Sequence, residues 1–96
     1  MDKLTYFQKE IHAILEDLES VLVRKNIDYG NSFDHQMEEW GLVSGAIRLS
    51  DKLNRLKQLI NPKHEQQVSD EAIEDTVLDT AGYAILFYRY LLNQKK

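Results

Sequence analysis

The sequence contains no cysteine, one proline and four glycines among its 96 residues. The lack of cysteine excludes disulfides, thiolate zinc sites and cysteine nucleophiles, and it fits a protein of a reducing cytosol. Proline and glycine are the residues that break helices most strongly, so their scarcity favours long helices. A chain of this length is expected to form a single domain, residues 1–96, with a modest core of its own.

Long apolar runs and an excess of positive charge are also missing. No segment reaches the ~20 apolar residues of a membrane span, so we expect no membrane partner. The first residues, MDKLTYFQKE, lack the features of a signal peptide, which favours a cytoplasmic protein. The formal net charge is -4, whereas nucleic-acid-binding domains usually have a basic face, so we expect no direct DNA binding.

Apolar residues recur at spacings of three and four in three segments, which is the pattern of one face of a helix. The helices are expected over residues 3–25, from about Trp40 or one turn earlier to Ile60, and from an N-cap at Ser69 to about Asn93. Between the first two, KNIDYGNSFDH is rich in turn-forming residues and predicts a loop. The expected fold is therefore all-α, a small bundle of three main amphipathic helices.

The third helix is apolar on nearly every side from Val77 to Leu92. Such a helix packs on more than one face. A chain with three helices has too few partners to cover it, so we expect a homo-oligomer, most simply a C2 dimer.

The second helix carries a band of small and basic residues beside its apolar face. At ~100° per residue, this band contains Gly41, Gly45, Arg48, Lys52 and Arg55, and Asp51 lies close to it. The glycines are expected to leave space and the cations to bind phosphate. A solvated basic edge and internal salt bridges are the alternatives.

The third helix carries Glu71, Asp75 and Asp79 at spacings of four, so these carboxylates stack on one side. Charged residues are rarely buried without a partner. We therefore expect Asp75 and Asp79 to lie within ion-pair reach of the cations of the second helix, or to hold a divalent ion. Magnesium suits such oxygen ligands. Structural ion pairs explain the same residues equally well.

The predicted loop is a further candidate site. Tyr29 is placed to stack on a base and Phe33 to pack beneath one. The alternative is a structural turn, in which Gly30 takes a positive φ and Tyr29 fills the core.

Three blocks, KNIDYGNSF, GAIRLSDKLNRLKQL and EAIEDTVLDTAGYAIL, resemble the family called nucleotide modification associated domain 1. The family pattern has a K-x-x-DYG loop, then R-x-x-DK-x-x-R, then E-x-x-x-DT-x-x-D-x-x-x-YA. The resemblance spans residues 25–86 and implies an all-α protein of phages and their bacterial hosts, with a role in nucleotide metabolism. The matching positions are Lys25, Asp28, Tyr29, Gly30, Arg48, Asp51, Lys52, Arg55, Glu71, Asp75, Thr76, Asp79, Tyr83 and Ala84.

The blocks are also similar to the wider group of MazG-like all-α pyrophosphatases. That similarity implies E-x-x-E and E-x-x-D carboxylates that hold magnesium, which activates water against a nucleoside triphosphate. Glu16-x-x-Glu19 and Glu71-x-x-Glu74 have the first spacing, but no E-x-x-D follows. The chain therefore departs from the pyrophosphatase pattern.

Three functions remain open. The first is nucleotide binding in an oligomeric protein, with magnesium-dependent hydrolysis of (deoxy)nucleoside triphosphates as its enzymatic form. Its catalytic and metal-binding residues would be Glu71, Asp75 and Asp79, and its nucleotide-binding residues Lys25, Asp28, Tyr29, Gly30, Arg48, Asp51, Lys52 and Arg55. The second is a non-catalytic protein that sequesters or senses a nucleotide. The third is a helical protein-interaction module whose charges are structural ion pairs.

Overall fold

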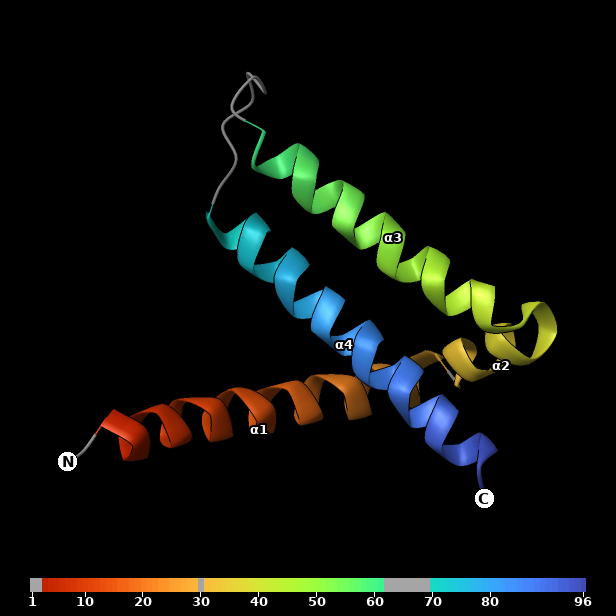
Figure 1. The fold of residues 1–96 in the computed structure, drawn as a ribbon, viewed down its shortest axis with the longest axis horizontal. Helices are drawn as coiled ribbons and strands as arrows, with labels where there is room; N and C mark the ends of the chain where they lie inside the picture. Colours follow the sequence, from red (N-terminus) through yellow and green to blue (C-terminus); the bar gives the residue numbers. More distant parts are fainter. Residues whose placement is uncertain (1–2, 30, 62–69) are drawn as a thin grey trace. The chain divides into compact units, whose positions relative to one another are not determined.

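The computed structural model describes residues 3–29, 31–61 and 70–96. These residues form four helices, α1 (Lys3–Tyr29), α2 (Ser32–Trp40), α3 (Leu42–Leu59) and α4 (Asp70–Gln94) (Figure 1). No strand occurs in the described ranges, which confirms the all-α prediction. The number of helices differs from the three that were predicted.

The segment predicted as a loop between the first two helices is itself helical. α1 continues to Tyr29 instead of ending near Lys25, and α2 begins within the segment that was assigned to turns, at Ser32. The loop prediction was wrong because short polar residues also suit helix ends. Asn31, with a φ of 62°, separates the two helices, and Asp34 lies in the first turn of α2, where a carboxylate is stabilised by the helix dipole.

The second predicted helix begins later than expected, because Gly41 interrupts the chain after Trp40. Gly41 has a φ of 82°, a conformation that glycine adopts without the steric cost of a side chain. Its backbone N–H donates to Met37 O, and its carbonyl accepts from the Ser44 N–H. Trp40 therefore ends α2, and α3 starts at Leu42. The predicted end near Ile60 is confirmed to within a residue, whereas the predicted N-cap Ser69 lies outside the described residues.

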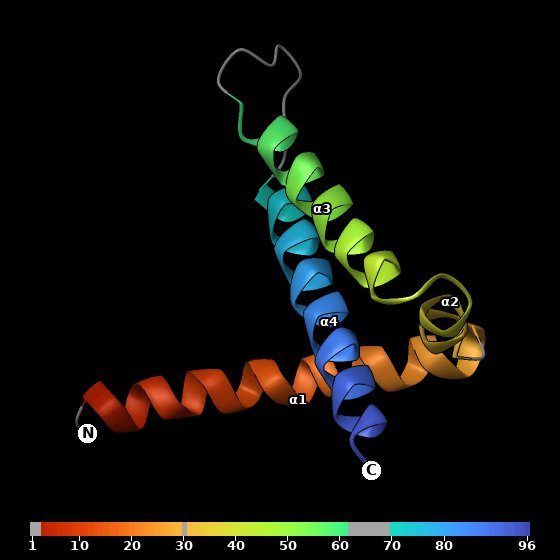
Figure 2. The same ribbon diagram turned by 45° about the vertical axis from the view of Figure 1, so that its right-hand side comes forward.

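The chain divides into two compact units, Met1–Ser32 and Phe33–Lys96. The first is essentially α1. In the second, α3 and α4 lie side by side, as both views show (Figures 1 and 2). Consecutive helices with a short connection pack antiparallel, and this hairpin is the framework of the second unit.

The core of the second unit is small. Met37 of α2 is its only large side chain among the described residues that is almost fully enclosed, at 1% exposure. Beside it, the Phe33 ring lies 6.3 Å from the Tyr83 ring and 6.5 Å from the Phe87 ring, centroid to centroid. Thr76 is buried on α4 and its hydroxyl donates to Ala72 O, so no polar atom is left unpaired there. This core fixes α2 against α4.

The cation edge of α3 as a candidate functional site

One side of α3 turns toward α4. Gly45 is buried on this side, and Arg48, Leu49, Lys52 and Leu56 are half-buried. The contact side therefore includes two of the three predicted phosphate-binding cations. We call Arg48, Lys52 and Arg55 the cation edge.

Arg48 is held in place by α2 and α4. Its Nη2 donates to Gln36 Oε1 at 2.6 Å, and its Cζ lies 5.9 Å from the centroid of the Tyr83 ring. The ring face attracts the guanidinium, which is a cation–π interaction. Both contacts are to neutral groups, so they orient the guanidinium without balancing its charge.

Lys52 lies on the same ring. Its Nζ is 5.7 Å from the Tyr83 centroid and 3.6 Å from Asp79 Oδ2. The Lys52 and Asp79 side chains are 28% and 39% exposed, so this ion pair is partly screened by water. The prediction that Asp79 lies within reach of a cation on α3 is confirmed.

The other charged residues of the predicted phosphate-binding band and of the predicted carboxylate row are exposed. Asp51 and Arg55 lie on the outer part of α3, and Glu71 and Asp75 on the outer part of α4. No ion pair of Asp75 is found among residues 3–29, 31–61 and 70–96, so its predicted pairing with the cations is not met within the described part of the chain.

Gly45 does not leave space for a ligand, and that expectation was wrong. A Cβ on Gly45 would lie 2.5 Å from Phe87 Cδ2 and Cε2 and 3.1 Å from Met37 Sδ. The missing side chain instead lets α2, α3 and α4 approach one another closely. At Gly41, by contrast, a Cβ would meet no atom within 4 Å.

The residues of the predicted loop belong largely to the first unit. Lys25 is exposed on α1, Asp28 and Tyr29 form the last turn of that helix, and Gly30 lies outside the described residues. Phe33 belongs to the second unit, where its ring packs against Tyr83 and Phe87. The interpretation of Phe33 as a platform beneath a base is therefore replaced by a role in the aromatic cluster.

The described part of the chain does not gather three acidic or histidine side chains closely enough to hold a metal ion. Glu71, Asp75 and Asp79 follow one another along α4, about 6 Å apart along the helix axis. Magnesium binding by these three residues therefore stays a prediction.

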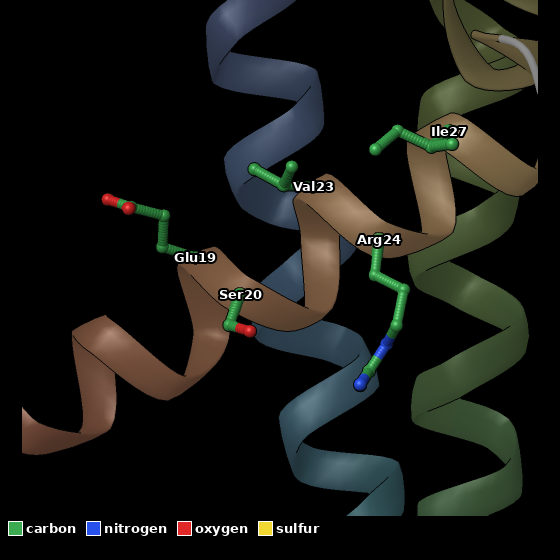
Figure 3. Close-up of a pocket in the computed structure, with 5 residues that line it drawn as sticks. All are labelled: Glu19, Ser20, Val23, Arg24 and Ile27. Atoms are coloured by element: carbon green, nitrogen blue, oxygen red, sulfur yellow. The ribbon is translucent and has the colours of Figure 1, made fainter.

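A shallow hollow lies elsewhere, on α1. It is lined by Glu19, Ser20, Val23, Arg24 and Ile27 (Figure 3). All five residues come from a single helix, so the hollow is a surface depression with one basic side chain. It offers far less positive charge than the cation edge.

Sequence patterns alone did not indicate the partners of the cation edge. Gln36 lies just beyond the predicted loop and was not singled out, and Tyr83 was noted only as a position of the family pattern. Tyr83 is four residues beyond Asp79 and four before Phe87 on α4. This spacing places it on the α3-facing side once that side is known.

The fold and the cation edge define a small all-α protein in which two basic side chains converge on one aromatic ring. The family model of nucleotide modification associated domain 1 matches residues 25–88, which is more than half of the chain, and the protein belongs to this family. The matched range includes all of α2 and α3 and most of α4. No curated protein and no solved structure matches the chain. None of the described helices is long and apolar enough to cross a membrane.

Proposed function

We propose that this protein binds a nucleotide and that the cation edge of α3 contacts the phosphates. One observation carries the proposal. Arg48 and Lys52 are both half-buried against the Tyr83 ring, yet Asp79 is the only carboxylate of the described residues within ion-pair distance of either. Two cations held this close repel each other. An anion that contacts both relieves the repulsion.

The donor groups suit a phosphate chain. A guanidinium has five N–H donors in a planar fork and an ammonium has three, and only one of the Arg48 nitrogens donates to Gln36. Arg48 and Arg55 are seven residues apart, about 10 Å along the helix axis, with Lys52 between them. Consecutive phosphates along α3 would therefore meet one cation after another. The family name, which refers to nucleotide modification, agrees with such a ligand.

The base and sugar need further contacts. The Lys25 and Asp28-Tyr29-Gly30 positions belong to the family pattern, and their contact with the base or the sugar stays a prediction from that pattern alone. Asp51, exposed on the same side of α3 as Arg48, is expected to orient the neighbouring cations.

Isothermal titration against ribo-, deoxyribo- and cyclic nucleotides tests the proposal. We expect binding that weakens as salt is raised, because the contacts are between charges. Arg48→Ala should lower the affinity at least tenfold, since a charge-assisted hydrogen bond contributes about 1.5–3 kcal/mol. Lys52→Ala should also weaken binding.

Lys57→Ala is the matched control for Lys52→Ala. Lys57 is an exposed lysine of the same helix that lies outside the cation edge. Its removal should leave the affinity within about twofold, while circular dichroism confirms that each variant is folded. The proposal is wrong if no nucleotide binds with or without magnesium, or if Lys57→Ala weakens binding as much as Lys52→Ala.

Turnover distinguishes the enzymatic form of this function from the sequestering form. Release of either phosphate or pyrophosphate in the presence of magnesium would support a hydrolase, and release of pyrophosphate together with the nucleoside monophosphate would identify a pyrophosphohydrolase. In that case Asp75→Asn should abolish release and leave most of the binding. Binding without release, with magnesium or manganese present, would support a protein that sequesters or senses the nucleotide.

A further inference from the structure

The α3–α4 hairpin has a large apolar surface that the described helices of the second unit leave uncovered. It includes Leu42 and Leu53 of α3, Ile60 at the C-cap of that helix, and Val77, Tyr88 and Leu91 of α4, each at least a third exposed. Ala46 and Ala84 lie between these side chains and are also exposed. We call these eight residues the outer face.

The outer face lies on one flank of the hairpin, and the charges lie on the other. Around the α3 axis, Leu53 lies ~80° to one side of Gly45 and Arg55 lies ~80° to the other. Around the α4 axis, Val77 lies ~100° to one side of Thr76 and Asp79 lies ~60° to the other.

The Lys52–Asp79 ion pair shows which sides of α3 and α4 lie on the same flank of the hairpin. Because Lys52 and Asp79 approach to 3.6 Å, the charged sides of α3 and α4 are on the same flank. Their apolar sides therefore share the opposite flank. The hairpin is amphipathic as a whole, with a charged flank and an apolar flank.

The size of the outer face is that of a protein interface. Eight side chains with this exposure amount to on the order of 700 Å², close to the about 800 Å² that each partner contributes to a standard interface. The apolar patches of monomeric proteins seldom exceed about 600 Å². The eight residues of the outer face are uncharged, and the exposed Lys57, ~120° from Gly45 around the α3 axis, lies at its edge, where its ammonium can stay in water.

We propose that the outer face binds the outer face of a second copy of this chain. A layer of two helices that is apolar on one flank must bury that flank against another layer. Two identical layers related by a twofold axis bury their apolar flanks against each other and form a four-helix bundle. In this dimer the two cation edges lie on opposite outer sides. Each copy then keeps its own nucleotide site, and no part of one site comes from the partner.

The test compares two valine variants of the full chain by light scattering. Val77 of the outer face is 51% exposed, and Val23 of α1 is 55% exposed. Wild type and Val23→Glu should both have twice the chain mass of 11.3 kDa at micromolar concentration. Val77→Glu should have the mass of a single chain, because dimerisation would bury its charge.

A second variant covers the case in which Val77→Glu does not fold. Tyr88 is 64% exposed, so Tyr88→Glu should keep the helical circular dichroism of the wild type and still lose the dimer. A wild-type protein that stays monomeric at high micromolar concentration would overturn the proposal. Folded Val77→Glu and Tyr88→Glu variants that both remain dimers would overturn it too, because the copies would then meet through another surface.

Discussion

Gly45→Ala is expected to destabilise the protein even though it replaces a helical glycine, the fourth residue of α3, by a better helix former. The added methyl group would lie 2.5 Å from two ring carbons of Phe87 and 3.1 Å from Met37 Sδ, whereas methyl and ring carbons pack at about 3.5–4.0 Å. The Phe87 ring must therefore shift by roughly 1 Å. It is half-buried and lies beside the Phe33 ring, so the shift disturbs the aromatic cluster.

Two opposing terms decide the size of the effect. Alanine is favoured over glycine inside a helix by about 0.8–1 kcal/mol. Overpacking a well-packed site costs about 1–3 kcal/mol. The expected net result is a loss of roughly 0–2 kcal/mol in the free energy of unfolding, in place of the gain that helix propensity alone would give.

Urea denaturation followed by circular dichroism measures this difference, and a double-mutant cycle isolates its cause. In a Phe87→Leu background the ring is absent, so Gly45→Ala should become neutral or stabilising by up to about 1 kcal/mol. If Gly45→Ala stabilises the wild-type background by the full helix-propensity term, then α3 and α4 are not packed as closely at Gly45 as described.

Three further changes should affect stability in graded amounts, measurable by the same denaturation experiment. Met37→Ala should cost about 2–5 kcal/mol, because it empties the most enclosed large site of the second unit; a loss below about 1 kcal/mol would contradict that role. Asp34→Asn should change stability by less than about 1 kcal/mol, because its 2.8 Å ion pair is to an Arg89 side chain that is 52% exposed. Asp79→Asn should cost a similarly small amount that shrinks with added salt, since Lys52 lies 3.6 Å away and both side chains are partly hydrated; a loss of several kcal/mol would indicate a buried ion pair instead.

The long helices could be predicted from the sequence because their apolar spacing continues over many turns. The predicted second and third helices are confirmed as α3 and α4, with ends displaced by one or two residues within the described ranges. The short helix α2 was missed for a physical reason. It has nine residues, too few to be stable alone, and it depends on burying Met37 and Phe33 against the hairpin. A local pattern of turn-forming residues contains no information about that packing.

The spacing of the three cations predicted that they share one side of α3, but it did not predict which residues surround them. Helical periodicity puts Arg48, Lys52 and Arg55 on one side of α3 without saying what that side faces. The structure shows that Arg48 and Lys52 face an aromatic ring and one carboxylate, and that Gly45 serves close packing instead of ligand access. Such partners come from α2 and α4, so only the tertiary arrangement reveals them.

The nucleotide site and the dimer are proposed for opposite flanks of the same hairpin, and this arrangement makes them separable by experiment. Val77→Glu should abolish the dimer and leave the nucleotide affinity per chain within about threefold, because Val77 lies on the flank away from Lys52. Lys52→Ala should weaken nucleotide binding and leave the mass of the dimer unchanged. Titration calorimetry and light scattering on the same two samples give both readouts. If Val77→Glu loses nucleotide binding while its helical content is intact, then the cation edge depends on the second copy, and the two flanks do not act independently.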